Sequence, residues 1–521
     1  MIKDLNPGPN SGNPIDLKVV GGAFYFQATD GVHGLELWKS DGTAAGTAML
    51  KDINSAGDSV PSDLTAFNGS LYFVANDGAH GAELWKSDGS EAGTVLVKDV
   101  NPTGAAGSNP ADLTVLGNAL YFSADDSSHG RELWRSDGTP AGTVMVANIN
   151  TKTATASSSP RGLVALGGRI YFSANDGTHG IEPWKSDGTA AGTALVKNIR
   201  PGSANSMNTL ISAVLGSSLC FQANDGTHGI ELWKTDGTAA GTAMVKNIRP
   251  GAKKSSTPNE LTTIGGTTYF VATNGTKGRE LWKTNGTAAS TSLVKDINPG
   301  SGGAGIASPY RFGTSLVFRA NDGTNGAEPW KSDGTAAGTV MIRDINTSAG
   351  FSSNPAGFVS LSGTLYFAAT DGAHGVELWR SNGAASGTVM VADINPTGDG
   401  NPRYITPFKA DLFFSATDPA HGTELWGLTD FSPPQTTLVS HPKKTVKTKK
   451  AISKALFRFR SDEQGSKFSC KLDSGKWKAC GSPKIVTLRK GKHTFQVRAT
   501  DRAGNVDATP AKWVWRIKRV K

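Results

Sequence analysis

The stretch Leu71-Tyr-Phe-Val-Ala-Asn-Asp-Gly-Ala-His-Gly-Ala-Glu-Leu-Trp-Lys-Ser-Asp-Gly-Ser decides the fold, because close copies of it recur along the first 430 residues. Its tryptophan returns at intervals of 47 to 50 residues. A fixed period of this length is typical of solenoids, propellers and other arrays of one small unit. The nine repeated tryptophans are Trp38, Trp85, Trp134, Trp184, Trp233, Trp282, Trp330, Trp379 and Trp426.

Each repeat is predicted to hold four short antiparallel strands. In the second copy these strands are expected at residues 61–67, 71–75, 82–86 and 94–100, and the Asn-Gly pair at 68–69 favours a hairpin turn. Both Tyr72 and Phe73 are large, although adjacent strand residues point to opposite faces, so both faces are expected to be covered. Four such strands in 40 to 50 glycine-rich residues describe a propeller blade. We therefore predict an all-β protein with a nine-bladed β-propeller over residues 1–430.

The two ends of the array predict how it closes. The last repeat has its third strand at residues 423–426 but no fourth strand after it, whereas residues 1–5 match a fourth strand without the first three. We expect this N-terminal strand to complete the ninth blade, which would leave no exposed sheet edge. The alternative is an open, superhelical stack of the same units. The seventh copy is irregular, with Ile306 and Pro309 where other copies have Pro and Leu.

The core of the repeat, Glu-Leu-Trp-x-x-Asp-Gly-Thr, is complete at residues 36–43 and 231–238. It resembles the bacterial family that is named for its ELWxxDGT repeats. The departures are mild: Pro replaces Leu at 183 and 329, and Asn replaces Asp at 285 and 382. The resemblance implies a secreted or surface-exposed repeat protein and implies no established activity.

The net charge of +9 hides two modules of opposite sign. Residues 431–521 hold 23 Lys and Arg against 5 Asp and Glu, whereas residues 1–430 hold 30 against 39. Such asymmetry favours a tail that meets a polyanion. We predict a basic, Pro- and Lys-containing linker at 431–452 and a small β-sandwich at 453–521, with strands near 455–460, 467–472, 484–488, 493–500 and 511–518.

The tail resembles a bacterial Ig-like domain of actinobacterial surface proteins, on the sequences at 468–480 and 491–507. Cys470 and Cys480 are ten residues apart across a Ser-Gly turn, and a hairpin of that length allows a disulfide. A disulfide places the protein in an oxidising compartment. Two cysteines without a second pair of ligands do not make a zinc site. We expect Cys220 to be a buried, inert thiol.

The turn after the second strand repeats Asp-Gly-x-His-Gly-x-Glu, and a histidine with acidic neighbours can bind a metal or act as a base. An enzyme needs one asymmetric site, so near-identical copies favour a structural role in the turn. We keep the histidines as binding candidates and assign no catalytic residue and no metal ligand. The histidines are His33, His80, His129, His179, His228, His374 and His421, and Lys277 and Asn325 take the other two places. The glutamates, interpreted as structural, are Glu36, Glu83, Glu132, Glu182, Glu231, Glu280, Glu328, Glu377 and Glu424.

We expect no cofactor, because no phosphate loop, nucleotide fingerprint or nucleophile elbow occurs. The Ser-Asp-Gly-Thr turns lack the alternating acids of a calcium loop, and calcium remains the alternative for them. The loops from the fourth strand to the next repeat, such as 55–60, 151–159 and 251–257, differ between copies. They are expected on the same face as the histidine turns, which favours ligand binding there; neutral drift of the loops is the alternative.

These observations predict a non-enzymatic, extracellular binding or adhesion protein. The loop face of the propeller would contact a glycan or a protein, and the basic tail would contact an anionic cell-surface polymer. The alternatives are a polysaccharide hydrolase or lyase with a unique cluster in the central channel, and a structural spacer. Nucleic acid is disfavoured because Trp477, Trp513 and Trp515 fit a sandwich core better than a stacking platform.

We expect a monomer without a transmembrane segment, since no apolar run reaches the length of a span. The chain opens within a repeat-like segment, so its start is interpreted as lying inside a longer precursor. The alternative is a genuine start and a cytoplasmic protein.

Overall fold

The computed structural model describes residues 1–521 except 104, 430–433, 464, 502–504 and 521. The chain divides into two compact units. The first comprises Met1–Thr406 and Phe413–Gly427, and the second comprises Pro407–Leu412 and Leu428–Lys521.

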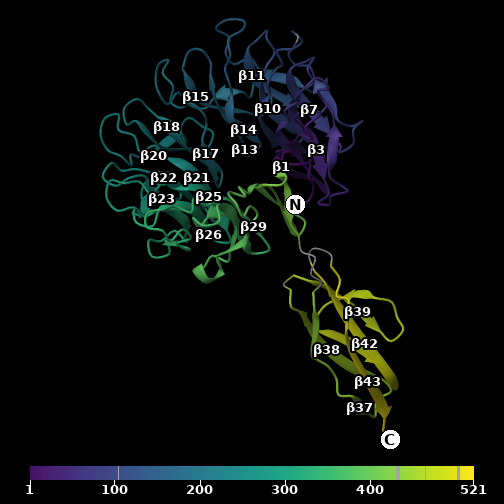
Figure 1. Ribbon diagram of the computed structural model, residues 1–521. Helices are drawn as coiled ribbons and strands as arrows, with labels where there is room; N and C mark the ends of the chain where they lie inside the picture. Colours follow the sequence, from purple (N-terminus) through teal and green to yellow (C-terminus); the bar gives the residue numbers. More distant parts are fainter. Residues whose placement is uncertain (104, 430–433, 464, 502–504, 521) are drawn as a thin grey trace. The chain divides into compact units, whose positions relative to one another are not determined.

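The repeats form eight four-stranded sheets, each joined in sequence order, and one three-stranded sheet (Figure 1). We call them the first to ninth sheets. The first strands are β1 (Ile15–Val20), β5 (Ser62–Phe67), β9 (Ala111–Leu116), β13 (Arg161–Leu166), β17 (Ser212–Leu215), β21 (Asn259–Ile264), β25 (Ala307–Phe312), β29 (Ala356–Leu361) and β33 (Arg403–Phe408). The second strands are β2 (Ala23–Ala28), β6 (Ser70–Asn76), β10 (Ala119–Asp125), β14 (Arg169–Asn175), β18 (Ser218–Asn224), β22 (Thr267–Ala272), β26 (Ser315–Asn321), β30 (Thr364–Thr370) and β34 (Asp411–Asp418).

The outer strands follow in the same order. The third strands are β3 (Glu36–Ser40), β7 (Ala82–Ser87), β11 (Arg131–Ser136), β15 (Ile181–Ser186), β19 (Ile230–Thr235), β23 (Glu280–Thr284), β27 (Ala327–Ser332), β31 (Val376–Ser381) and β35 (Gly422–Leu428). The fourth strands are β4 (Ala48–Lys51), β8 (Val95–Lys98), β12 (Val144–Ala147), β16 (Ala194–Leu195), β20 (Ala243–Lys246), β24 (Ser292–Lys295), β28 (Val340–Met341) and β32 (Val389–Ala392), and a short 3-10 helix, η1 (Ala385–Gly387), precedes the last of them. From the first sheet to the eighth, first strands of successive sheets contact each other, and third strands lie farther out (Figure 1).

The core lies between consecutive sheets rather than within any one of them. In one cluster, Tyr25 and Leu37 of the first sheet pack with Leu71, Phe73 and Trp85 of the second. Phe73 and Trp85 are direct cross-strand partners. Burial on both faces explains why both alternating positions of the second strand are apolar, as predicted. The all-β, propeller-like arrangement of antiparallel four-stranded sheets is therefore confirmed.

The Asp-Gly turn after the third strand lies against the preceding sheet. Gly138 has a φ of +92°, and a Cβ at this position would overlap the hydroxyl of Tyr72. By contrast, Gly69 has a φ of +77° and no atom within 4 Å of an added Cβ. The glycine of the repeat core is thus required by a close approach between neighbouring sheets as well as by its backbone angle.

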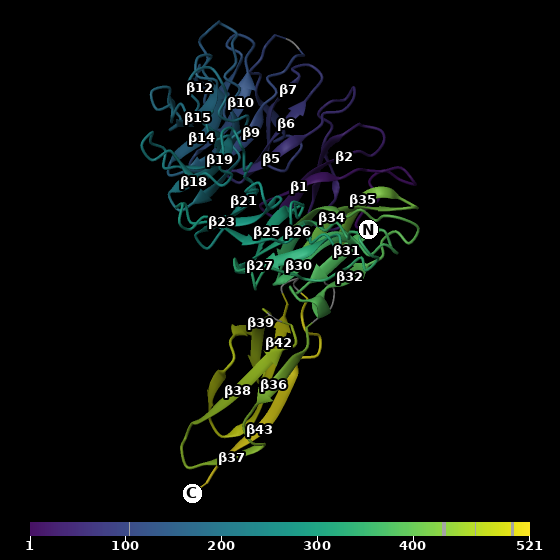
Figure 2. The same cartoon turned by 90° about the vertical axis from the view of Figure 1, so that its left-hand side faces the viewer.

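The N-terminal segment lies beside β35, as Figure 2 also shows. Lys3 forms an antiparallel bridge with Leu425, and the Ile2 N–H donates to the Leu425 carbonyl at 2.7 Å. We expected a full fourth strand at residues 1–5, and the structure has this single bridge instead. Further along the chain, Phe24 of the first sheet packs on Phe413 of the ninth, with ring centroids 4.8 Å apart.

The second unit consists mainly of two sheets, β36–β38–β41 and β37–β43–β42–β39–β40. The strands are β36 (Thr436–Ser440), β37 (Thr445–Thr448), β38 (Ser453–Ser461), β39 (Lys467–Leu472), β40 (Lys478–Cys480), β41 (Lys484–Leu488), β42 (Gly491–Thr500) and β43 (Ala511–Arg519). Phe457, Phe495 and Trp515 form the centre of the core between them. The predicted disulfide is confirmed: Cys470 and Cys480 are bonded and join β39 to β40.

The structure corrects the predicted linker at 431–452. Residues 430–433 lie outside the described residues, but β36 and β37 fall within the remainder and belong to the two sheets. β37 pairs in parallel with β43, with Val446 opposite Ile517. The sequence around Val446 is rich in lysine and was therefore interpreted as a linker. In the structure it is a strand, and Val446 is its apolar residue. No helix among the described residues has the length and apolar character needed to cross a membrane.

Candidate functional site

Each candidate histidine belongs to a different sheet, and each forms a hydrogen bond with the aspartate of its own turn. In the first sheet, the Nδ1 atom of His33 lies 2.7 Å from an Asp30 carboxylate oxygen, and the other oxygen accepts from the His33 N–H at 2.9 Å. All seven histidines make this bond at 2.6–2.9 Å. Asp30 raises the pKa of His33, and Asp371 does the same for His374. The described residues bring no three metal-ligating side chains together, so these histidines do not converge on one site.

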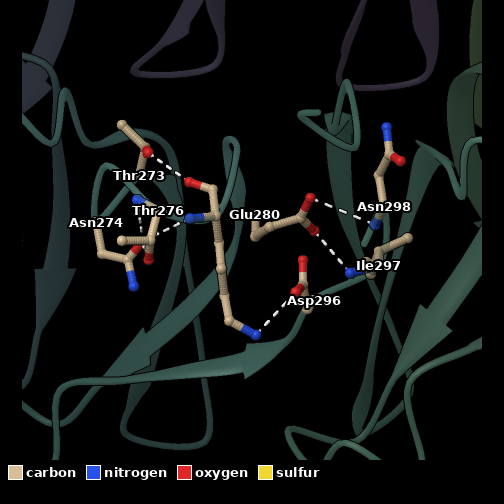
Figure 3. Close-up of polar contacts among 8 residues, drawn as sticks. Thr273, Asn274, Thr276, Glu280, Asp296, Ile297 and Asn298 are labelled. Carbon is tan, nitrogen blue, oxygen red and sulfur yellow. Dashed lines mark hydrogen bonds and ion pairs between the residues drawn. The ribbon is translucent and has the colours of Figure 1, made fainter. Parts of the chain in front are cut away.

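The two repeats without histidine keep the turn by other bonds. Asn325 donates from Nδ2 to Asp322 at 2.8 Å. In the sixth repeat the Lys277 N–H donates to Asn274, while its ammonium reaches forward to Asp296 at 2.8 Å (Figure 3). The turn therefore keeps its form without an imidazole, and the histidine–aspartate bond is one of several that hold it.

The nine glutamates are fully buried and clamp each repeat to the segment that leads into the next one. Glu36 accepts from the N–H groups of Ile53 at 2.8 Å and Ser59 at 3.1 Å, and from the Ser59 hydroxyl at 2.7 Å. Figure 3 shows the equivalent Glu280, which accepts from Ile297 and Asn298. The structure therefore places these glutamates in the scaffold and away from solvent.

Burial raises the pKa of these carboxyls, because the charged form loses its hydration. The rise is largest for Glu182, Glu280 and Glu424, whose pKa is raised to about 7. Ala304 stands where six other repeats have a serine, and the hydroxyl of the first of these, Ser59, bonds Glu36; Glu280 therefore has one acceptor bond fewer than Glu36. Gly12 takes this place beside Glu424.

A pocket of about 530 Å³ lies along the first strands β33, β1, β5 and β9. The first strands β1, β5 and β9 each have a bulge, and in these three neighbouring sheets the bulge residue is an aspartate with positive φ: Asp16, Asp63 and Asp112. The Asp112 carboxylate accepts from the Gly162 N–H of the next sheet at 2.9 Å. Desolvation raises the pKa of Asp63, and the nearby Asp112 raises it further. Sequence patterns did not reveal this cluster, since the bulge that aligns the aspartates follows from sheet pairing.

A second pocket, of about 480 Å³, occurs at the fifth sheet. Its walls come from the segment between the fourth and fifth sheets, including Arg200 and Asn205, and from Gln222 and Asn224 of β18. No residue predicted as a site from the sequence lines it. The sequence does contain one sign of this pocket, which is the absence of a proline before β17. The other eight repeats have a proline or the irregular Ile306 at that position.

The five-stranded sheet of the tail carries a basic outer face. Trp515 and Ile517 of β43 are buried, whereas the alternating Arg516 and Lys518 are exposed. The strands of this sheet contain no Asp or Glu. The outer basic face, as we call it, comprises Lys447, Lys467, Lys471, Lys492, Arg498, Lys512, Arg516 and Lys518.

Like charges are direct neighbours on this outer basic face. Lys492 pairs opposite Arg516, and Lys447 pairs opposite Lys518. Directly opposed like charges destabilise a sheet. The guanidinium of Arg498 lies 4.5 Å from the ring centroid of Trp477, which adds an aromatic surface. A polyanion would offset the repulsion between these cations.

No protein-family model matches the chain. No curated protein matches it either. Three of the solved structures that resemble the chain are distant in sequence and in fold. A puromycin hydrolase mutant shows 14% identity over 70% of this chain and 60% of its own, with a TM-score of 0.35. A puromycin-hydrolysing peptidase of Mycobacterium tuberculosis shows 11% identity over 89% of this chain and 61% of its own, with a TM-score of 0.38. An extracellular domain from B. thetaiotaomicron, described as part of a one-component system, shows 9% identity over 96% of this chain and 85% of its own, with a TM-score of 0.26. Similarities at this level carry no inference about activity.

Proposed function

We propose that this protein is an extracellular, non-catalytic binding protein of the ELWxxDGT-repeat type, with an Ig-like tail that contacts an anionic cell-surface polymer. The outer basic face carries this proposal. This face has eight cations, and its strands carry no acid. Directly opposed cations such as Lys492 and Arg516 repel each other and destabilise the sheet, and a bound polyanion would offset this repulsion. The confirmed disulfide supports an oxidising, extracellular setting.

The first unit is proposed to be a closed propeller of nine blades that presents its loops to a glycan or a protein. The contacts of the N-terminal segment support closure. Lys3 donates to the Thr47 carbonyl at 2.6 Å, as Lys51 does to Thr94 at 2.8 Å in the next pair of repeats. A closed ring positions the variable loops and the histidine turns on one rim, where the Leu35 N–H beside the His33 turn donates to Asp58 of the loop at 2.7 Å.

The polymer proposal is tested with the full chain and two probes, poly(glycerol phosphate) and polygalacturonate. The dissociation constant is measured from about 50 to 500 mM NaCl, and affinity is expected to fall steeply with salt because of charge screening. A triple variant, K492Q/R516Q/K518Q, is expected to bind at least about tenfold more weakly, as each charge contributes on the order of 1 kcal/mol.

A matched control removes the same charge from the other sheet. K454Q/R458Q/R460Q changes exposed positions of β38 and should alter affinity by less than about threefold, since a distant charge acts only through the screened field. Equal losses in the two triple variants would show that net charge alone drives binding. Salt-independent affinity, or tighter binding to single-stranded DNA of equal charge, would also contradict the proposal.

A second candidate function follows from the pocket of the first strands. Three aspartates around a cavity of about 530 Å³, one with its pKa raised by burial and by its neighbours, are compatible with an acid and a base acting on a polysaccharide. The test is the release of reducing ends from polygalacturonate and from neutral glucans. Activity that is lost in Asp63→Asn would establish a hydrolase, and absence of activity with the intact chain would leave binding as the function.

A further inference from the structure

The fifth sheet differs from all the others by one inserted residue. Ala213 stands seven positions after Ser206, whereas Thr65 stands six positions after Ser59, and the equivalent residues of every other repeat are also six positions apart. The usual proline is also absent here. The first strand β17 begins only at Ser212, which pairs with Phe221.

The insertion moves the chain away from β18. In the second sheet Val74 pairs with Ser62, but the equivalent Gln222 has no partner in β17. Met207 and Leu210 turn into the core between the fourth and fifth sheets. The space left over Gln222 is the pocket of about 480 Å³, within the roughly 300–1,000 Å³ typical of small-molecule sites.

The lining of this pocket is rich in hydrogen-bond donors. Asn205 and Asn224 use their side-chain oxygens to accept from the N–H groups of Ile181 at 2.8 Å and Gly226 at 2.7 Å. The side-chain amides of these two asparagines can therefore offer their N–H donors to a ligand. Asn208, Thr209 and Gln222 add polar groups, and no carboxylate is among the lining residues.

Arg200 is the only charged residue of the lining. Its Nη1 donates to the Asn205 carbonyl at 3.1 Å, which holds the guanidinium at the rim. A guanidinium has five N–H donors, and its fork matches a carboxylate. Ile211 and Ile230 supply apolar walls. One cation, several amide donors, no acid and aliphatic walls fit a small molecule that carries one carboxylate and several hydroxyls.

We propose that this pocket binds an acidic monosaccharide unit, such as a uronic or sialic acid residue. The carboxylate pairs with Arg200, the hydroxyls accept from the amides of Asn205 and Asn224, and the C–H face of the ring packs on Ile230. This inference rests on the proposed binding role of the propeller, and it names the ligand class and the repeat that would recognise it.

The repeats themselves supply matched variants. Arg200→Asn installs the residue that the equivalent loop has at Asn54, where the Nδ2 atom donates to the Asp58 carbonyl at 3.0 Å, so the loop keeps its brace and loses its charge. Arg249→Asn is the control, because Arg249 occupies the same place in the next loop, where the usual proline and the usual spacing before the first strand are kept. Gln222→Val installs the residue of Val74, and Gln27→Val is its control in the first sheet.

Binding of sodium glucuronate, N-acetylneuraminate and glucose to the full chain is followed by ligand-observed NMR titration. We expect the two acidic sugars to bind with a dissociation constant on the order of 1 mM, as ligand efficiencies predict for molecules of this size. Arg200→Asn and Gln222→Val should weaken binding at least about tenfold and fivefold, and both controls should leave it unchanged. Thermal unfolding of each variant confirms that it is folded.

Three outcomes would overturn the inference: no binding of either acidic sugar, equal binding of glucose, or equal losses in Arg200→Asn and Arg249→Asn. The titration is repeated with K492Q/R516Q/K518Q, in which the tail charge is reduced. Sugar binding that persists there places the site in the propeller, and sugar binding that disappears there places it in the tail and refutes the pocket. Failure of the pocket leaves the polymer measurements with the tail variants unaffected, so the two proposals fail separately.

Discussion

The Glu424 carboxylate accepts a hydrogen bond from the backbone N–H of Leu5 at 2.8 Å, across 419 residues of sequence. It also accepts from the Gly12 N–H at 2.6 Å. Glu36 holds Ile53 and Ser59 in the same manner, within 23 residues. The N-terminal segment thus stands in the same relation to the last repeat as each connecting segment does to the repeat before it.

Glu424→Ala should loosen the N-terminal segment. Each buried donor left without an acceptor costs about 1–3 kcal/mol, so the free energy of unfolding should fall by roughly 2–4 kcal/mol. Amide hydrogen exchange should rise at residues 1–12. Glu83→Ala is the control and should instead raise exchange near residues 100–108, where Val100 and Ser108 donate to Glu83. Unchanged exchange at residues 1–12 in Glu424→Ala would contradict this role.

The stability of the first unit should decrease between pH 5 and pH 8. Burial raises the pKa of Glu182, Glu280 and Glu424 from 4.5 to about 7, so the folded chain holds protons that the unfolded chain has released. Their contribution to the free energy of unfolding is complete below pH 4.5 and is lost as the pH rises through 7. At about 1.4 kcal/mol per pKa unit, each group accounts for roughly 1–3 kcal/mol.

Ala304→Ser tests the cause of this dependence. The new hydroxyl is placed to bond Glu280 as Ser59 bonds Glu36, which should lower the pKa of Glu280 and flatten the pH dependence of urea unfolding. A wild-type stability that is constant over this pH range would show that these carboxyls are ionised when buried.

Gly138→Ala should be more destabilising than Gly69→Ala. Both glycines have positive φ, so each substitution costs about 1 kcal/mol of backbone strain. Only at position 138 does the added methyl group overlap the hydroxyl of Tyr72, which should raise the total to about 3 kcal/mol. Thermal unfolding of the two variants measures the difference, and equal midpoints would rule out the close contact.

Asp30→Asn should return the pKa of His33 toward its ordinary value. The carboxylate raises that pKa by its hydrogen bond and its charge, and an asparagine keeps the turn, as Asn274 does in the sixth repeat. NMR titration of the imidazole C–H signals gives the pKa. Asp52→Asn is the comparison and should have a smaller effect, since Asp52 acts on His33 only through its charge. An unchanged His33 pKa in Asp30→Asn would contradict the pairing.

The sequence predicted most of the strands but not the special features of the sites. Period and turn residues placed the strands of the second repeat within one or two residues of β5 to β8, because each repeat meets the same environment on both faces. The Cys470–Cys480 bond followed from a short hairpin. The alignment of Asp63 with Asp112 depends on bulges in strand pairing, which no local pattern marks. The pocket at Gln222 depends on a single inserted residue, whose effect is visible only when the repeats are aligned on their strands.

The bond between Leu5 and Glu424 has a practical consequence for the order of the repeats along the chain. Ends that lie side by side allow circular permutation. A permutant that begins in the exposed loop at 151–155, with residues 427 and 1 joined by a short peptide and the tail moved to the new end, should fold with the same contacts. Any repeat of the array can then be made the first.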